Sequence, residues 1–440
     1  MSDLLAARSQ MAMSLAFHIV FAAIGIAMPL LMVIAEWRWL RTGDRGYLTL
    51  AHRWGRGTAI LFAVGAVSGT VLSFELGLLW PRFMGYAGAI IGMPFSLEGF
   101  AFFTEAIFLG VYLYGWDRVP PRAHLLSGVA VAVSGMLSGV FVVIANAWMN
   151  TPAGFTLVDG VPVDIRPFAA MANPHAFPQV LHMTLAAYAA TGLAVAGLHA
   201  LLLRRNPASA FHRKACGIAL AVGAVAAVLQ PVSGDIAAKA VARNQPVKLA
   251  AFEGHFETEE GAPLHIGGWP DEAAGVTRWA IPIPYGLSLL AYNDPHAEVL
   301  GLNDVPRENW PPVAVTHLAF QVMVACGTVM ALVGLWFLWR WWRGRRREGT
   351  AWHASRRFLL AVGMMTPLGF LAIESGWVVT EVGRQPWIIY EIMRTRDAVT
   401  PMPGLVVPFL GFTTLYVLLA IATVWLMRRQ VMEPEEAGDA

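Results

Sequence analysis

Two carboxylates stand near the end of a long apolar segment that begins near Phe358. Glu374 and Glu381 are seven residues apart, about two helical turns, so both would point to roughly the same side of a helix. A charged side chain in hydrocarbon costs at least ~2.5 kcal/mol, so it usually has a partner or a task. Arg384 and Pro386 then end the helix and add a cation. The pattern predicts a polar site at one end of a membrane helix.

Further polar and sulfur-containing side chains lie in other apolar segments at a similar expected depth. The depth of each side chain follows from its distance along the helix from the expected outer end of its span. By this measure the outer halves of the spans contain His18, Glu75, Glu98, Glu105, His182 and Met323. For a single histidine an interhelical hydrogen bond is the simpler explanation, and for Met323 it is core packing. Structural hydrogen bonding alone would not favour one side of the membrane, so the grouping indicates a functional site.

The donor types indicate which metal such a site would bind. Imidazole, thioether and carboxylate donors suit an iron porphyrin better than a hard cation, and histidine with methionine is a ligand pair of low-spin electron-transfer haems. A haem with one strong protein ligand leaves a position open for dioxygen. The sequence has no adjacent His-His pair and no four-histidine pattern, which argues against a copper-containing oxidase and a quinone-oxidising cytochrome b. Two cysteines, Cys216 and Cys326, exclude a disulfide framework and a four-cysteine metal site.

The composition is that of an integral membrane protein. Of the 440 residues, 57% are hydrophobic and 14% are charged, whereas soluble domains have about 25% charged residues. Nine apolar segments are each near the ~20 residues that a span requires. We therefore expect an all-α integral membrane protein with about nine transmembrane helices, at residues 11–36, 57–80, 95–116, 125–148, 178–203, 215–233, 313–340, 358–381 and 403–427.

Basic residues gather in alternate loops, after spans one, three, five, seven and nine. The loop between spans seven and eight is the richest, with Arg340, Arg343, Arg345, Arg346, Arg347, Arg356 and Arg357. The positive-inside rule then puts the N-terminus outside and the C-terminus in the cytoplasm. The Pro- and Gly-rich segment 234–312 falls outside, and a long ordered loop is usually functional. We expect three parts: 1–233 with helices one to six, the periplasmic segment 234–312, and 313–440 with helices seven to nine and a cytoplasmic tail.

Several motifs carry these residues. They are Arg8-Ser-Gln-Met-Ala-Met-Ser-Leu-Ala-Phe-His18, Glu98-Gly-Phe-Ala-Phe-Phe-Thr-Glu105, Ile144-Ala-Asn-Ala-Trp-Met149, Val247-Lys248-Leu-Ala-Ala-Phe-Glu253, Phe320-Gln-Val-Met323 and Gly376-Trp-Val-Val-Thr-Glu381-Val-Gly-Arg-Gln-Pro-Trp387, with His182 in span five. Together they resemble subunit I of the cytochrome bd family of quinol oxidases over essentially the whole chain. The last motif, together with Lys248 and Glu253, is the most specific part of the resemblance.

The resemblance implies three haems, two of type b and one of type d. His182 and Met323 match the axial pair of the low-spin haem b. His18 and Glu381 match the proximal ligands of the two high-spin haems, and which of them serves which haem stays open.

Four further residues match the catalytic part of the family pattern. Glu98 and Glu105 match acids tied to the oxygen site and its proton supply. Trp377 and Arg384 match a haem-bridging aromatic residue and a partner of a haem propionate.

The same resemblance assigns Lys248, Glu253 and Arg8 to quinol binding, with the first two in the loop between spans six and seven. Quinol oxidation releases protons and electrons, so Glu253 could accept a proton while Lys248 stabilises a developing oxygen anion. Without the family pattern, an ion pair on the protein surface would be the simpler explanation for these two residues.

The chain departs from the family pattern at some positions. Gln321 stands two residues before Met323, where many members have arginine, and this predicts an altered environment of the low-spin haem. The short loop 234–312 and the segment Tyr112-Leu-Tyr-Gly-Trp-Asp-Arg118 resemble the cyanide-insensitive branch. In that branch haem b can replace haem d, so the identity of the third haem stays open.

The predicted function is a terminal quinol oxidase of the bacterial cytoplasmic (inner) membrane, which reduces dioxygen to water. The resemblance implies subunit II as a partner, a small single-helix accessory subunit as a further one, and contact with membrane lipid but not with nucleic acid. Two alternatives remain from the sequence: a proton- or ion-coupled helical transporter, since buried acids also mark such paths, and a structural membrane subunit.

Overall fold

The computed structural model describes residues 1–346 and 352–432. In this part of the chain, nine helices are long and apolar enough to cross a membrane, as predicted. They are α1 (Asp3–Thr42), α2 (Arg45–Leu79), α3 (Pro81–Tyr114), α4 (Pro121–Asn150), α6 (Ala176–Arg205), α7 (Ala210–Asn244), α10 (Val313–Arg346), α11 (Arg356–Val382) and α13 (Val406–Met427). Arg347 and the expected acidic end of the tail, 433–440, lie outside the described residues.

Polar side chains cap the ends of several spans. Ser2, Asp44, Ser209 and Ser355 each accept a hydrogen bond from a backbone N–H in the first turn of α1, α2, α7 and α11. Such N-caps satisfy amide groups that have no partner within the helix. Helix α11 ends at Val382, directly before the Gly-Arg-Gln-Pro segment, as the sequence predicts.

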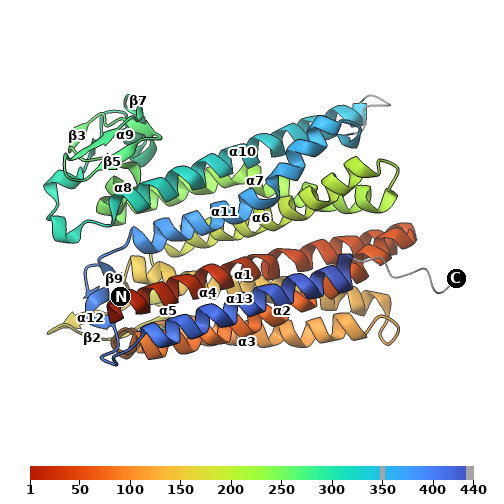
Figure 1. Cartoon of the computed structure of the whole chain (residues 1–440), viewed down its shortest axis with the longest axis horizontal. Helices are drawn as coiled ribbons and strands as arrows, with labels where there is room; N and C mark the ends of the chain where they lie inside the picture. The colour runs from red at the N-terminus through yellow and green to blue at the C-terminus, as the bar shows by residue number, and fades with distance from the viewer. Residues whose placement is uncertain (347–351, 433–440) are drawn as a thin grey trace.

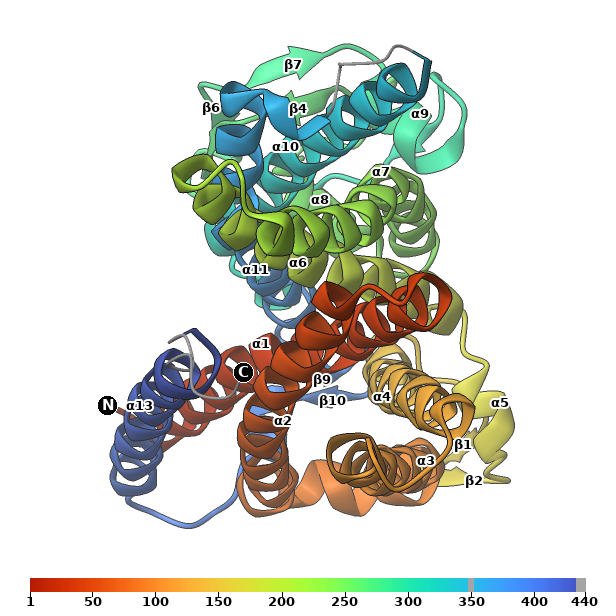
Figure 2. The same cartoon turned by 90° about the vertical axis from the view of Figure 1, so that its right-hand side faces the viewer.

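The spans form two groups (Figure 2). Helices α6, α7, α10 and α11 pack in a ring, each against two of the others. Helices α1 to α4 form the second group, with α13 against α1 and α2. Helix α1 also packs on α6 and so joins the two groups. Small residues allow the closest approach: a Cβ on Gly192 of α6 would lie 2.7 Å from the Cα atom of Gly223 on α7.

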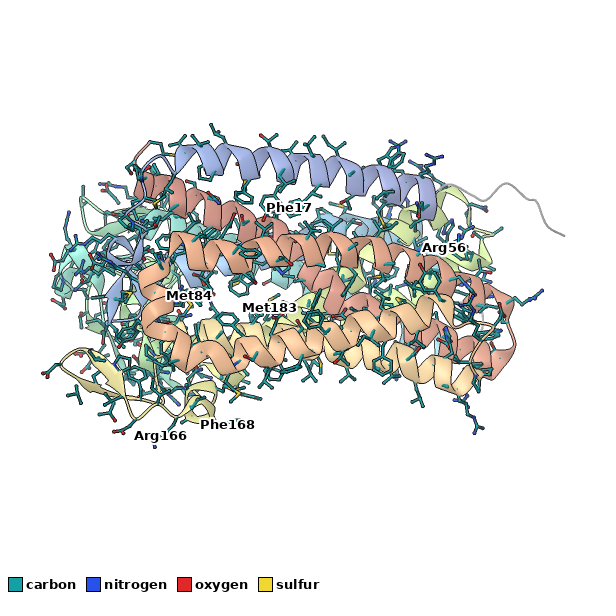
Figure 3. All side chains as sticks on the ribbon, turned by 90° about the horizontal axis from the view of Figure 1, so that it is seen from below. Phe17, Arg56, Met84, Arg166, Phe168 and Met183 are labelled. Atoms are coloured by element: carbon teal, nitrogen blue, oxygen red, sulfur yellow. The ribbon has the colours of Figure 1, made fainter. Side chains whose placement is uncertain are left out.

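Helix α3 changes direction along its length. Its first part, which includes Met84, runs across the end of the bundle from α2, and the remainder runs alongside α2 and α4 (Figure 3). Pro94 lies inside this helix, and an internal proline removes a backbone hydrogen bond and bends a helix. Glu98 follows about one turn after Pro94, so it stands near the start of the spanning part.

The segments outside the spans gather at one end of the molecule, opposite to the Arg-rich loops (Figure 1). The chain between α7 and α10 has the helices α8 (Pro246–Glu253) and α9 (Gly286–Tyr292). It also has three antiparallel strand pairs, which are β3 (Glu259–Glu260) with β8 (Glu298–Val299), β4 (Leu264–Ile266) with β7 (Ile281–Ile283), and β5 (Trp269–Asp271) with β6 (Val276–Arg278). Helix α7 continues to Asn244, so this segment begins at Gln245 and not at the expected residue 234.

Shorter extramembrane elements complete the same end. After α4 come the hairpin of β1 (Thr156–Val158) and β2 (Val161–Val163) and the helix α5 (Pro167–Met171). After α11 come β9 (Trp387–Ile389), β10 (Met393–Arg394) and α12 (Thr395–Ala398). The first residues of α1 lie at this end and the end of α13 at the other (Figure 1).

Candidate functional site

A serine on the neighbouring helix orients His18. The Nδ1 atom of His18 on α1 lies 2.9 Å from the Ser68 hydroxyl on α2. Ser68 itself donates to the backbone carbonyl of Val64 at 3.0 Å, so its oxygen is left to accept from the Nδ1–H of His18. This tautomer keeps Nε2 as a free electron-pair donor, the form that ligates a metal. A Cβ at Gly69 would stand 3.0 Å from the imidazole, so a glycine makes room for the ring.

His182 has the same arrangement in the other helix group. Its Nδ1 atom lies 3.0 Å from the Ser233 hydroxyl on α7, and Ser233 donates to the carbonyl of Gln230 at 2.9 Å. The Nδ1–H group is thereby used and Nε2 is left as the acceptor. The amide nitrogen of Gln230 lies 3.2 Å from this Nε2 atom. His182 thus also presents Nε2 as an electron-pair donor, which in this structure accepts from the Gln230 amide.

Met323 stands on α10, across the four-helix ring from α6. Its sulfur faces α11, where a Cβ on Gly376 would lie 3.0 Å from Sδ. Within the described residues, no three His, Cys, Asp or Glu side chains converge as a metal cage would require. Single donors such as these suit an ion that is already held in a tetrapyrrole.

The acids of α3 both face α4. The Ser138 hydroxyl donates to the Glu98 carboxylate at 3.1 Å. Glu105 is 5% exposed, and a Cβ on Gly135 would lie 3.0 Å from its carboxyl group. Two carboxyl groups thus line the α3–α4 interface, about two turns apart along one helix face.

A continuous hydrogen-bonded network surrounds Glu381 at the end of α11. The Asn146 amide donates to one carboxylate oxygen of Glu381 at 2.5 Å, and Arg384 donates to the other at 2.5 Å. Asn150 donates to the side-chain oxygen of Asn146 at 3.2 Å. The Lys248 ammonium on α8 donates to Asn150 at 2.6 Å. The network therefore links the extramembrane helix α8 to the carboxylate in α11 through α4.

Several buried polar atoms in this region have no partner in the protein. They are Nε and Nη1 of Arg384, Nε1 of Trp377 and Oε1 of Glu374. A buried donor without an acceptor costs free energy, so such groups usually mark a bound ligand or water. Arg384 is 2% exposed, and its two unused donors could bind an anion such as a haem propionate. The residues present thus fit a haem at this site.

Lys248 and Arg384 border a common cavity of about 130 Å³. Its other lining residues come from the segments around β9 and before α10, and they include Trp387, Tyr390 and Asn309. Burial, with the nearby Arg384 charge, lowers the pKa of Lys248 to about 7. An amine with this pKa exchanges protons readily at neutral pH.

Glu253 ends α8 and lies elsewhere. It is fully buried, neither carboxyl oxygen has a hydrogen-bond partner, and it is not part of the lining of this cavity. Burial raises its pKa to about 8. Lys248 is 3% exposed and bonds to Asn150 and to Gln245 instead. The surface ion pair between Lys248 and Glu253, the simpler alternative from the sequence, is therefore wrong, because both side chains are buried and each has different surroundings.

The structure groups the predicted residues in three places. His182 and Met323 belong to the four-helix ring, and His18, Glu98 and Glu105 belong to the α1–α4 group. The α8 end of the molecule contains the third set, which is Lys248, Glu253, Trp377, Glu381 and Arg384. Arg8 is exposed in the first turns of α1 and is not part of the cavity lining that includes Lys248.

Four residues of these sites received no role from the sequence: Ser68, Ser233, Asn146 and Asn150. Asn146 lies within a quoted motif, which was the available signal. The serines have no local signal, since each bonds to a histidine some fifty residues away in the chain.

Comparison with known proteins gives one consistent result. Residues 6–434 match the family model described as cytochrome bd terminal oxidase subunit I. A Bacillus subtilis (strain 168) protein named putative cytochrome bd menaquinol oxidase subunit I is 36% identical, over 97% of this chain and 96% of that one. The cytochrome bd ubiquinol oxidase subunit 1 of the same organism is 31% identical, over 99% and 95%. The solved structure of bd oxidase from Geobacillus thermodenitrificans matches with a TM-score of 0.91 and 39% identity, over 98% of each chain.

Proposed function

The chain belongs to the cytochrome bd terminal oxidase subunit I family, and we propose that the side chains described above form a low-spin haem site, an oxygen-reducing site that includes Glu381, Trp377 and Arg384, and a quinol site around α8. The protein is a haem-containing quinol:oxygen oxidoreductase subunit of the bacterial respiratory membrane. This function, and not ion-coupled transport, is the one that the relatives share.

The four-helix ring is the low-spin site in this proposal. His182 and Met323 would hold a haem b, because imidazole and thioether are a ligand pair that favours electron transfer. Ser233 holds the His182 ring by its Nδ1–H and presents Nε2. Small neighbours, Gly234 beside His182 and Gly376 beside Met323, leave room near both donors.

The α1–α4 group and the end of α11 would hold two high-spin haems, with His18 and Glu381 as their ligands in an order that stays open. One of these haems is of type b and the other is haem d, or haem b in its place. When bound, the haems supply the one-electron carriers and the iron at which dioxygen is reduced. Arg384 supports this proposal with its unused donors, which would bind a propionate, and Trp377 lies on α11 together with Glu381.

Quinol would bind at the α8 end, where Lys248 lines the cavity, and the family resemblance adds Glu253 and Arg8, which are outside its lining. The positive-inside rule places this end outside, since the Arg-rich loops are at the other end. Both buried groups titrate near neutral pH, Lys248 at about 7 and Glu253 at about 8. Each can therefore take up a proton from a quinol and release it again at the working pH. The proposed quinol segment runs from Gln245 to Pro312.

The protons consumed in making water would come from the cytoplasmic side. Glu105 and Glu98 both face α4, and Glu98 lies nearer than Glu105 to the outer end of α3. Protonatable groups in series mark proton paths in membranes. Glu105 would therefore receive a proton first and pass it toward Glu98, with Ser138 holding the Glu98 carboxylate.

The complete enzyme would contain subunit II and membrane lipid, with a small single-helix accessory subunit as a further partner. The exposed apolar side chains of the spans, such as Phe100, Phe103 and Leu418, suit burial against another helical subunit or lipid.

The shared serine–histidine arrangement on two separate helix groups is the single observation that carries the assignment of sites. Purification of the complex followed by a pyridine haemochrome spectrum and quinol-dependent oxygen uptake tests it. We expect three haems per complex and turnover with a soluble quinol. A colourless complex would contradict the proposal.

A further inference from the structure

Gln321 is a departure from the family pattern to which the proposed function gives no role. It stands two residues before Met323, so the sequence predicts an effect on the low-spin haem. Its amide points instead toward the extramembrane segment: Nε2 donates to the carbonyl of His265 at 3.0 Å, and Oε1 accepts from the backbone N–H of Gly267 at 3.0 Å. Both sides of the amide are used, and both partners belong to β4 and the turn that follows it.

His317 acts from the same face of α10, one turn earlier. Its Nδ1 atom lies 2.9 Å from the carbonyl oxygen of Phe252 on α8, and Nε2 lies 3.1 Å from that of Gly267. Side chains four residues apart share a helix face. Carbonyl oxygens only accept, so the ring donates to one of them in either neutral tautomer and to both as imidazolium. His317 is fully buried, and it connects α8 to the turn that Gln321 also holds.

Thr277 on β6 encloses the end of α8 from the other side. Its hydroxyl donates to the carbonyl of Gly254 at 2.5 Å. Gly254 directly follows Glu253 and has a positive φ of 65°, which favours glycine. A Cβ there would also lie 2.6 Å from the Thr277 hydroxyl and 3.1 Å from His317 Nδ1. The residue after Glu253 is therefore held tightly between two contacts.

We propose that His317, Gln321 and Thr277 form a clamp that fixes the C-terminal end of α8 and thereby positions Glu253 for quinol oxidation. The carboxyl group of Glu253 has no hydrogen-bond partner of its own, so the backbone on either side of it must set its position. The three are positioning residues, since they act through α8 and the β4–β5 turn. The inference rests on the proposed quinol site, and it assigns Gln321 to the quinol segment and not to the haem.

Two variants of the purified complex test the clamp. Gln321→Met removes both amide bonds at nearly constant volume, and Thr277→Val removes the hydroxyl on a segment that is separate from Met323. We expect Gln321→Met to lower kcat/KM for a soluble short-chain quinol about tenfold and Thr277→Val to lower it several-fold, as for lost hydrogen bonds. The spectrum and midpoint potential of the low-spin haem stay unchanged. Val324→Ala, at an exposed position of α10, is the matched control and leaves both readouts as in the wild type.

A second measurement separates the possible failures. Hydrogen exchange at the Gly267 amide should accelerate in Gln321→Met, because this N–H donates to Gln321. A shifted haem spectrum or potential with unchanged quinol kinetics overturns the clamp, as do unchanged quinol kinetics in both variants. If the wild-type complex lacks haem or quinol turnover, the proposed function is wrong. The clamp is tested separately by hydrogen exchange, and unaltered exchange at Gly267 in Gln321→Met would overturn it.

Discussion

The four-helix ring and the α1–α4 group share one serine–histidine arrangement in different surroundings. In each, a serine that bonds to its own helix accepts from the Nδ1–H of a histidine on the next helix and leaves Nε2 as the electron-pair donor. In His182 this Nε2 atom lies 3.2 Å from the amide nitrogen of Gln230. The ring supplies a thioether as its second donor, whereas the α1–α4 group supplies the carboxyl groups of Glu98 and Glu105. In the proposed function, the histidine would set where a haem is held, and the neighbouring side chains would set whether protons are delivered there.

The largest effect is expected from substitution of each histidine in turn, which tests whether the two helix groups hold separate haems. We expect His182→Ala to abolish the low-spin signal. His18→Ala should abolish one high-spin signal while the low-spin signal remains, because the two imidazoles belong to different helix groups. Reduced-minus-oxidised spectra of the purified variants measure this. His296→Ala, at an exposed loop position, is the control. Loss of the same band in both variants would show that the two groups do not hold separate haems.

Removal of the acids tests the chemical difference between the groups. Glu105→Gln and Glu98→Gln should each reduce oxygen consumption about a hundredfold or more, as expected for loss of a proton-transferring group. Haem content should be retained, since neither residue is a proposed ligand. Thr104→Ala, at an exposed position on α3, controls for changes to the helix. Normal turnover in Glu105→Gln would remove this residue from the proton path.

Substitution of the serines tests the serine–histidine hydrogen bond separately from the imidazole itself. Ser68→Ala and Ser233→Ala keep each imidazole but remove the acceptor that fixes its tautomer. We expect a 10- to 100-fold weaker haem retention, or a similar loss of activity, as for other groups that orient metal ligands. The effect should be confined to the high-spin signal in the first variant and to the low-spin signal in the second. Equal loss of both signals in either variant would contradict the separation of the two sites.

The smallest effect concerns the buried groups of α8, which lie outside both helix groups. The pKa of Glu253 is raised from 4.5 to about 8, so the folded protein keeps a proton that the unfolded chain has released between these values. Stability should therefore fall as the pH rises through this window. We expect thermal unfolding between pH 5 and 7 to show a shallower decline in Glu253→Gln than in the wild type. Lys248 contributes with the opposite sign, but only above about pH 7. Identical slopes would show that Glu253 is not buried as a neutral acid.

The sequence by itself determined the nine spans, the end of α11 at the Gly-Arg-Gln-Pro segment and the types of side chain available for chemistry. Hydropathy and segment length are local properties, and the bilayer thickness makes them sufficient to predict spans. The chemistry of the donor groups could also be predicted, because imidazole, thioether and carboxylate groups have few uses in apolar helices. The start of the segment between α7 and α10 was expected too early, since α7 extends as a helix beyond its apolar part, to Asn244.

Only the tertiary structure decided which groups meet. Lys248 bonds to Asn150, 98 residues away in the chain, while Glu253, five residues along the same short helix, has no such partner. The Gln321 amide holds the turn after β4, and Ser68 and Ser233 orient the two histidines. Each of these hydrogen bonds joins elements brought together by packing, and a bond of about 3 Å depends on distances and directions that no local pattern in the sequence specifies.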